Sequence, residues 1–333
     1  MSENKKDFGT TLTKVNDLYF PLIEKQLEGN HIDFDDYAKR CVINSISAIN
    51  DMFTTSGTSW NDQNLDQSNV TQVLLNVASL KLNPAADPSE CYFQIRNVKV
   101  KVRDEKGKVI DKWLKRIEFG IQSDGNDSIL ARFGRNIKKV YPHWVVREND
   151  VFEYPKFNGL EMTPPKWEPR YTGKVVRVVY PILHNDNTLH FYIAEREDVK
   201  KNLLAHINNN MMNETFGIVA DRYSANAEQL EQISKRKKDL KLLASALSLD
   251  EILDDETLAP YISPSWKEEF SREEMLIRKM RNNITKKIPK DFGNVAIQES
   301  FMESTDEDYL QAKEDIINYT ATELIEDTTT TFE

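Results

Sequence analysis

Cysteine is scarce in this sequence of 333 residues, and its placement excludes two classes of protein. The two cysteines, Cys41 and Cys91, lie far apart and belong to no paired motif. Small secreted domains and zinc modules depend on closely spaced cysteines. We therefore predict two buried or incidental thiols in a reducing cytoplasm, and neither a disulfide framework nor a cysteine-based zinc site.

Histidine is also rare, and none of the five histidines is spaced with a cysteine as a zinc ligand would be. His184 and His190 flank a turn and could meet across a hairpin, although two separate surface histidines are the more common arrangement. The acidic stretches Asp250-Glu251 and 254–256 could indicate a metal-dependent nuclease. Solvated faces of polar helices explain the same residues with fewer assumptions.

Long apolar runs and nucleotide-binding motifs are missing as well. No stretch approaches the roughly 18 apolar residues of a membrane span, and Met1–Asp7 contains no apolar signal region. The Gly-x-x-x-x-Gly-Lys-Ser/Thr phosphate loop is absent. We expect a cytoplasmic protein that does not contact membranes and does not hydrolyse ATP.

Charge is abundant and unevenly distributed. The chain has 44 basic and 54 acidic residues, which gives a net charge of −10. From Gln298 to the C-terminus, eleven residues are acidic and only Lys313 is basic, so residues 1–297 are balanced. We expect a disordered N-terminus over 1–14 and a disordered acidic tail over 296–333. The tail could dock a partner or compete for a basic surface, and a purely solubilising end is the alternative.

A basic β-hairpin is the organising element of the balanced part. Apolar and polar residues alternate there, which predicts a half-buried strand with a cationic outer face. The apolar side holds Val98, Val100 and Val102, and the polar side holds Asn97, Lys99, Lys101 and Arg103. Residues 104–108 predict the turn, and Val109–Ile121 predicts the returning strand. A solvated face explains any single lysine, but fourteen bases against six acids between Gln94 and Arg147 favour a polyanionic partner.

Helical periodicity surrounds the hairpin and defines the fold class. The pattern predicts helices over 34–52 (with Asp33 as the N-cap), 73–80, 128–141, 228–247 and 266–288, and strands over 144–151, 174–180 and 189–194. In the last helix Arg278, Asn282 and Lys286 share a face and could form the second wall of a groove. We predict an α+β fold in which helices, including a long C-terminal one, pack around a small antiparallel sheet with a basic hairpin.

The order of these features resembles the RecT and Red-beta-like phage single-strand annealing proteins. Five segments carry the resemblance: Pro21–Ile23 with the helix that follows, Ala78–Pro84 with Tyr92, Gly125 to Gly134 around Arg132, Val146–Tyr154, and Trp266, Met275, Lys286 and Pro289. In the same order, the first two are similar to the family's opening helices and to its alanine-x-leucine-glycine-leucine-x-proline motif with a tyrosine strand. The third is similar to its glycine-to-glycine segment. The last two are similar to its valine-x-x-x-aspartate-x-phenylalanine-x-tyrosine strand end and to its closing helix. The resemblance covers about residues 15–292.

The sequence departs from the family pattern at several positions. Lys81 stands where a glycine is usual, Gly120 comes two residues too early, and Arg278 replaces a common lysine. Asn282 stands where the family has an arginine that is expected to contact a phosphate. The segment over 196–260 is longer than usual, so we interpret part of it as a helical insertion within an annealing domain spanning 15–295.

The resemblance implies a recombination protein that binds single-stranded DNA and pairs complementary strands without ATP hydrolysis, inside the bacterial host of a phage. Cations can hold phosphates while base edges stay free to pair. The residues expected to bind DNA are Lys99, Lys101, Arg103, Lys112, Lys115, Arg132, Arg135, Lys138, Lys139, Arg278, Asn282 and Lys286. The implied partners are single-stranded DNA, the duplex intermediate, further copies of the chain in a ring or filament and, through the tail, a phage exonuclease or a host single-strand-binding protein. We expect no catalytic residue and no cofactor, with Mg²⁺ possible together with DNA.

Other functions stay open on the sequence alone. A protective coat for single strands would block pairing, a metal-dependent nuclease would degrade strands, and a phage structural or adaptor protein would show no salt-sensitive DNA binding. The aromatic residues near the hairpin are Tyr92, Phe93, Trp113 and Phe119. They could stack bases, although packing in the core is the more common role of such residues.

Overall fold

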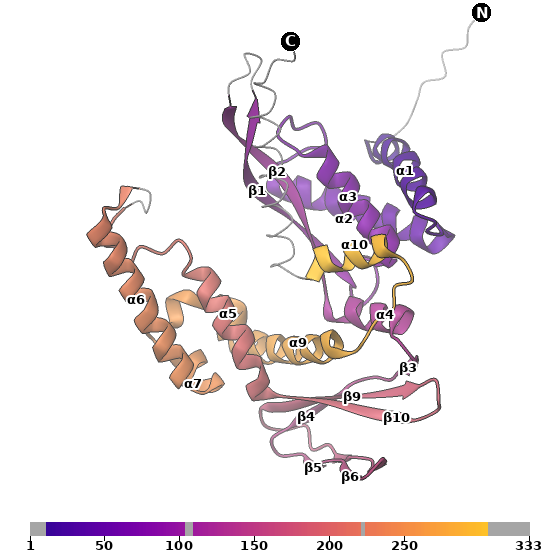
Figure 1. Ribbon diagram of the computed structural model, residues 1–333, viewed down its shortest axis with the longest axis vertical. Coiled ribbons are helices and arrows are strands. Elements are labelled where there is room, and N and C mark those ends of the chain that lie inside the picture. The colour runs from indigo at the N-terminus through magenta and orange to yellow at the C-terminus, as the bar shows by residue number, and fades with distance from the viewer. Residues whose placement is uncertain (1–10, 104–108, 221–223, 306–333) are drawn as a thin grey trace, which may run out of the picture. The chain divides into compact units, whose positions relative to one another are not determined.

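Residues 11–103, 109–220 and 224–305 are described by the computed structural model, in which the chain divides into two units. The first unit comprises the residues up to Phe133 and those from Asp291 onward, and the second comprises Gly134–Lys290. Helices and small antiparallel sheets make up both units (Figure 1), as the α+β prediction requires. The single domain expected over 15–295 therefore spans both units. None of the described helices is long and apolar enough to cross a bilayer.

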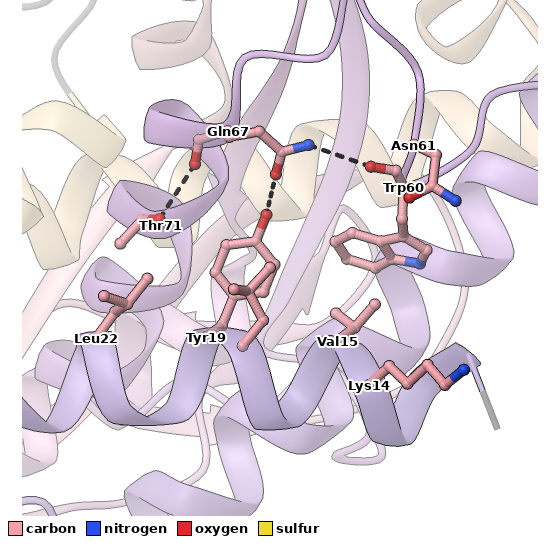
Figure 2. Close-up of a pocket in the computed structure, with 9 residues that line it drawn as sticks. Lys14, Val15, Tyr19, Leu22, Trp60, Asn61, Gln67 and Thr71 are labelled. Carbon is pink, nitrogen blue, oxygen red and sulfur yellow. Dashed lines mark hydrogen bonds between the residues drawn. The ribbon is translucent and has the colours of Figure 1, made fainter. Parts of the chain in front are cut away.

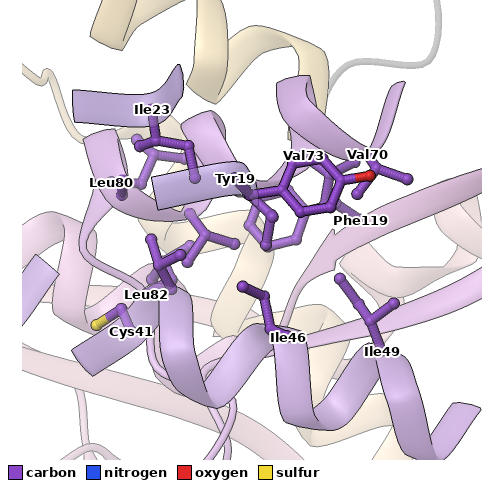
Figure 3. Close-up of a cluster of buried hydrophobic side chains, with 14 of the residues drawn as sticks. Tyr19, Ile23, Cys41, Ile46, Ile49, Val70, Val73, Leu80, Leu82 and Phe119 are labelled. Atoms are coloured by element: carbon purple, nitrogen blue, oxygen red, sulfur yellow. The ribbon is translucent and has the colours of Figure 1, made fainter. Parts of the chain in front are cut away.

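Three helices form the core of the first unit. They are α1 (Thr11–Gly29), α2 (Asp36–Ser56) and α3 (Gln67–Leu80). Figure 3 shows their facing side chains, including Tyr19 and Ile23 from α1, Ile46 and Ile49 from α2, and Val73 and Leu80 from α3. Removing such apolar surface from water contributes about 25 cal/mol per Å². Both cysteines are free thiols buried in this unit, as expected.

The ends of α2 and α3 are fixed by one linked pair of residues. Asp35, and not the expected Asp33, is the N-cap of α2 and accepts a hydrogen bond from the backbone N–H of Ala38 at 2.8 Å. Lys81 ends α3 in the left-handed conformation, with φ of 53°. Its Nζ lies 2.6 Å from Oδ2 of Asp35. A side chain at a left-handed position costs about 1–2 kcal/mol, and this ion pair offsets part of that cost where the resembling family has glycine.

The hairpin has the predicted pairing. Strands β1 (Cys91–Arg103) and β2 (Val109–Ile121) run antiparallel over their whole length. The turn expected over 104–108 lies outside the described residues. Helix α4 (Ser123–Phe133) follows β2, and Gly125 allows its close approach to the hairpin, because a Cβ there would lie 2.0 Å from the carbonyl O of Glu90.

The start of the expected acidic tail is folded. Helix α10 (Val295–Thr305) contacts α3 and β2 and buries Ile297 and Ser300. The prediction of a disordered tail from residue 296 is therefore wrong for 296–305. The prediction of a disordered N-terminus over 1–14 is wrong for 11–14, which belong to α1. Residues 1–10 and the rest of the tail, 306–333, lie outside the described residues.

An antiparallel sheet forms the base of the second unit. Its central strand β9 (Val175–His184) pairs with β10 (Leu189–Glu195) along one edge and with β3 (Ile137–Val140) and β4 (Trp144–Arg147) along the other. The helix expected over 128–141 is wrong beyond the end of α4. Asn136 adopts a left-handed φ of 61°, and the following residues pair with β9 instead.

An arm of two short strand pairs connects β4 to β9. Its strands are β5 (Val151–Glu153), β6 (Lys156–Asn158), β7 (Glu161–Thr163) and β8 (Lys166–Glu168), which pair as β5–β8 and β6–β7. Asp150 fixes the base of the arm. Its carboxylate accepts hydrogen bonds from Nε1 of Trp167 at 2.9 Å and from the backbone N–H of Arg147 at 2.8 Å.

The helices of the second unit include one that lies along the sheet. In chain order they are η1 (Arg196–Val199), α5 (Lys200–Asn210), α6 (Ala227–Ala246), α7 (Leu249–Asp254), η3 (Ala259–Tyr261), α8 (Pro264–Lys267) and α9 (Glu269–Lys287). Figure 1 shows α9 beside β9 and β10, where Nε of Arg281 donates to the hydroxyl of Tyr180 at 2.9 Å. The long helix expected over 266–288 is interrupted at Glu268, whose ψ of 133° is extended.

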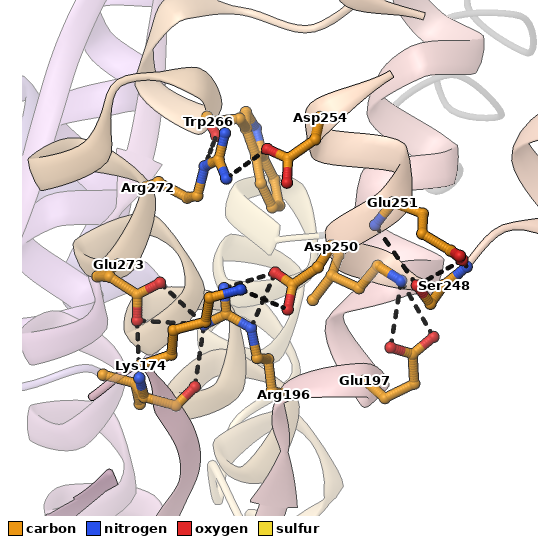
Figure 4. Close-up of polar contacts among 12 residues, drawn as sticks. Lys174, Arg196, Glu197, Ser248, Asp250, Glu251, Asp254, Trp266, Arg272 and Glu273 are labelled. Atoms are coloured by element: carbon orange, nitrogen blue, oxygen red, sulfur yellow. Dashed lines mark hydrogen bonds and ion pairs between the residues drawn. The ribbon is translucent and has the colours of Figure 1, made fainter. Parts of the chain in front are cut away.

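An ion-pair network joins the 196–260 segment to α9 and the sheet (Figure 4). The guanidinium of Arg196 lies 2.7 Å from Asp250 of α7 and 2.9 Å from Glu273 of α9, and it donates to the carbonyl O of Val175 at 2.9 Å. The segment interpreted partly as an insertion is therefore integral to the second unit. Asp250, one of the acids that could have indicated a nuclease, has a structural partner.

Candidate nucleic-acid interface

The register of the hairpin distributes its cations over two faces. Lys99 lies opposite Trp113, whereas Lys112 lies opposite a valine of the apolar side. Directly opposed residues share a face and successive residues alternate. Lys112 and Lys99 therefore lie on opposite faces of the hairpin, and DNA binding by Lys112 stays a prediction. The side chains of Lys101 and Arg103 lie outside the described part of the structure.

Two predicted DNA-binding residues are engaged within the first unit. Nζ of Lys115 lies 2.8 Å from Oδ2 of Asp62, and this hydrogen bond holds the pKa of Asp62 below its usual value. The guanidinium of Arg132 lies 3.8 Å from Glu90 and 5.6 Å from the ring centroid of Tyr37. Both cations are paired within the first unit, so each attracts a phosphate less strongly than an unpaired cation would.

Arg96 is an exposed cation of the hairpin that the predicted site omitted, although the fourteen bases counted between Gln94 and Arg147 include it. It lies directly opposite Arg116, whose Nε bonds Oδ2 of Asp66 at 2.9 Å, and Arg96 itself has no ion pair among the described residues. Like charges opposite each other on paired strands repel. Both arginines line a groove of about 380 Å³ with α3 and α10, but Glu118 and Glu303 line it too and reduce its attraction for a polyanion.

The aromatic residues of the hairpin have two different roles. Phe119 is buried and stacks on Phe93 with ring centroids 5.8 Å apart, so these two pack in the core, as we considered more common. Trp113 is 59% exposed. The ring of Tyr92 covers Gly120, where an added Cβ would lie 2.2 Å from it, so a side chain there would displace this ring.

The α9 candidates lie on one stripe of the helix in the second unit. Arg278 and Lys286 are exposed and Asn282 is half-buried. The predicted apolar stripe is buried and consists of Ile277, Met280, Ile284 and Ile288. The burial of the apolar stripe is confirmed. DNA binding by Arg278, Asn282 and Lys286 stays a prediction. The hairpin and α9 belong to different units, so the groove expected between them also stays a prediction.

A cluster of cations forms where the end of α9 meets the chain leading into β3. The backbone N–H of Arg135 donates to the carbonyl O of Pro289 at 2.9 Å, and the residue before it forms a β-bridge with Lys290. These contacts bring Arg135 to the end of α9 that carries Lys286 and Lys287. We call the set of Arg135, Lys286, Lys287 and Lys290 the basic corner.

Lys290 is half-buried at the basic corner and has a lowered pKa. Its Nζ donates to two backbone carbonyls in the last turn of α9, at 2.7 and 3.1 Å, where a cation suits the helix dipole. Burial and, secondly, the charge of Lys286 lower the pKa of Lys290 to about 8. Arg135 and Lys287 are exposed and form no ion pair within the described part of the chain. The sequence reasoning missed Lys287 and Lys290, because it restricted the site to a single helix face.

Lys138 and Lys139 lie on a strand, not on the predicted helix, and they have different surroundings. Nζ of Lys138 donates to Oδ1 of Asn187 in the turn between β9 and β10, at 2.7 Å. Lys139 pairs with Leu183, and its Nζ lies 4.7 Å from the ring centroid of Tyr141. Only Lys138 therefore extends the basic corner toward the β9–β10 turn.

A separate cavity of the first unit holds none of the predicted residues. It measures about 550 Å³ and is lined by Tyr19 and Leu22 of α1 and by Trp60 and Gln67 (Figure 2). The hydroxyl of Tyr19 donates to the side chain of Gln67, which donates in turn to the carbonyl O of Trp60 at 3.1 Å. Burial raises the pKa of Tyr19 to about 12, so this phenol stays protonated at neutral pH.

Metal chemistry and known relatives add no further assignment. Among the described residues, no group of three or more histidine, cysteine and acidic side chains is arranged to hold a metal ion. The chain matches no protein-family model and no curated protein. The basic corner and its surroundings are therefore the candidate site.

Proposed function

We propose that this protein binds single-stranded DNA through its phosphates and anneals complementary strands without hydrolysing a nucleotide. The basic corner is the observation that carries the proposal. Repulsion from the charge of Lys286 contributes, after burial, to the lowered pKa of Lys290, and backbone contacts bring Arg135 to the same end of α9. A bound polyanion relieves such repulsion, and exposed lysine and arginine side chains can hold phosphates without reading sequence.

The stripe on α9 continues the basic corner along the helix axis. Arg278 and Lys286 are eight positions apart, which corresponds to about 12 Å at 1.5 Å per residue. One strand of a duplex carries a phosphate about every 3.4 Å, so this length faces about three phosphates. Contacts of this kind leave the base edges free, which pairing with a second strand requires.

The proposal includes assembly and partners. Several copies binding along one strand would align its bases for pairing with a complementary strand. The protein would act in the cytoplasm of a bacterial host, and the acidic residues after Thr305 would dock an exonuclease or a single-strand-binding protein. A protective coat that binds but does not anneal is the alternative outcome.

A charge-reversal experiment tests the proposal. The variant carries Arg135→Glu, Lys286→Glu and Lys287→Glu, and the matched control reverses three exposed bases of α6, Lys235, Arg236 and Lys238. Gel shifts compare one strand, a preformed duplex and two complementary strands added in turn. We expect the wild type and the control to bind one strand and speed pairing, and the corner variant to do neither.

The outcomes separate the candidate functions. Binding that blocks pairing would identify a protective coat, and degradation that requires Mg²⁺ would identify a nuclease. If the wild type shows no salt-sensitive binding, the proposed function is wrong. If the corner variant binds as well as the wild type, the assignment of the basic corner is wrong.

A further inference from the structure

Three aromatic rings meet next to the turn between β9 and β10. The ring centroid of His184 lies 4.3 Å from that of His190 and 6.4 Å from that of Tyr192, and the last two are 6.5 Å apart. In the strand register His190 pairs with Ile182, and Tyr192 pairs with Tyr180. Because side chains alternate along a strand, all three rings share one face of the sheet. We call His184, His190 and Tyr192 the ring platform.

Hydrogen bonds hold the ring platform in place. The hydroxyl of Tyr192 lies 3.2 Å from Nε2 of His184, and Nε2 of His190 lies 3.0 Å from the hydroxyl of Thr188. The carboxylate of Asp186 accepts from the hydroxyl and the backbone N–H of Thr188, at 2.6 and 2.9 Å. Rings fixed before binding lose little conformational entropy when a ligand stacks on them.

The ring platform is accessible and at least partly uncharged. His190 is exposed, while His184 and Tyr192 are half-buried. Burial, and then the neighbouring His190, lower the pKa of His184 from its ordinary value of 6.5. The His184 ring is therefore neutral at pH 7 and offers a π face, which suits stacking of a flat, uncharged ring.

Two cations from the chain around β3 lie beside the turn that carries the ring platform. Nζ of Lys138 is bonded to Asn187 within that turn. The backbone N–H of Asn185 donates to the carbonyl O of Asn136 at 2.9 Å, which brings Arg135, the residue before Asn136, next to the turn. Phosphates held by these cations would be attached to bases within reach of the rings.

We infer that the ring platform of His184, His190 and Tyr192 is a stacking site for an unpaired nucleobase whose adjoining phosphates are held by Lys138 and the basic corner. This inference rests on the proposed function and adds a base contact to it. Stacking tolerates any sequence because every base has a π face. It also leaves the Watson–Crick edge of the base free, as annealing requires.

Two strands with equal numbers of phosphates provide the test. The probes are an oligothymidylate and an abasic strand of the same length, measured by fluorescence anisotropy with the full-length protein. One lost stack costs about 1–3 kcal/mol, which corresponds to about 5-fold or more in affinity. We expect His190→Ala to weaken binding of oligothymidylate by at least this factor, while affinity for the abasic strand and the salt slope stay unchanged.

Two further variants control for folding and for ring exposure in general. His190→Phe restores an aromatic face and should recover binding of oligothymidylate. If His190→Ala acted only by damaging the β9–β10 pair, this second variant would not recover binding. Phe157→Ala removes another ring, 73% exposed on the arm, and should leave both affinities unchanged.

The possible failures are distinguishable. Equal weakening of both strands by His190→Ala, or no effect on either, overturns the stacking site and leaves the proposed function intact. Wild-type protein that binds neither strand at low salt overturns the proposed function. Failure of His190→Phe to restore binding, with unchanged thermal stability, also overturns the stacking site.

Discussion

Neutralising the basic corner should flatten the salt dependence of DNA binding without unfolding the protein. The variant carries Arg135→Gln, Lys286→Gln and Lys287→Gln. The bond from Arg135 to Pro289 uses the backbone, and the side chains of Lys286 and Lys287 are exposed. Lys290 is kept because its Nζ donates to the carbonyls at the end of α9. Loss of three phosphate contacts is therefore the main expected effect.

The magnitude follows from counterion release. If the wild type neutralises about five phosphates, log affinity falls with log salt at a slope of about −3.5, and the loss of three contacts changes the slope to about −1.4. Between 50 and 200 mM salt the wild type should lose about 100-fold in affinity and the variant about 7-fold. Fluorescence anisotropy of a labelled oligonucleotide at four salt concentrations measures both slopes.

A matched variant makes this measurement decisive. Changing Lys235, Arg236 and Lys238 to Gln removes the same charge from an exposed face of α6. It should leave the slope near that of the wild type. An unchanged slope in the corner variant, or equal flattening in the α6 variant, would refute the reasoning, because binding would then depend on net charge alone.

Three further predictions concern stability. Arg196→Leu removes the ion pairs with Asp250 at 2.7 Å and with Glu273 at 2.9 Å, so we expect urea denaturation to show a loss of about 3 kcal/mol, partly recovered by adding Asp250→Asn. Lys81→Gly should be nearly neutral in thermal melting, since relief of left-handed strain offsets the lost ion pair with Asp35, whereas Lys81→Ala should cost about 1 kcal/mol. Burial lowers the pKa of Lys290 to about 8 from 10.5, so the unfolded chain binds that proton more tightly; stability should rise with pH between these values, and Lys290→Met should remove this rise in urea denaturation.

Helical periodicity was sufficient for α9, whose stripe containing Met280 is buried as expected, because the local sequence records which side of a helix faces the core. Strand alternation predicted the antiparallel hairpin but not its buried face. Phe93 and Ile95, on the side of Lys99, pack against the core, whereas Val98 and Val100 are only half-buried. Capping was harder to predict, because Asp33 and Asp35 have the same chemistry and only Asp35 also meets Lys81.

Periodicity failed where pairing with a distant strand decides the conformation. Residues 137–140 fit a helical pattern, yet they form β3 because β9 offers an unpaired edge there. Charge counting failed for a related reason. Lys115 and Arg132 contribute to the basic excess of the sequence, but Asp62 and Glu90 reduce their potential, and neither acid is near its partner in the sequence.

The basic corner shows why the site could be predicted only in part. Arg135 and Lys286 were predicted for separate reasons, one from a charge count and one from a helix face. They come together only because the chain before β3 pairs with the residues after α9, a contact between segments far apart in the sequence. The same contact half-buries Lys290 and places it among other cations, which the lowered pKa records. A cation that folding brings close to other cations is stronger evidence for a polyanion than the same charge in a local run, because residues in a run can find their partners elsewhere in the fold.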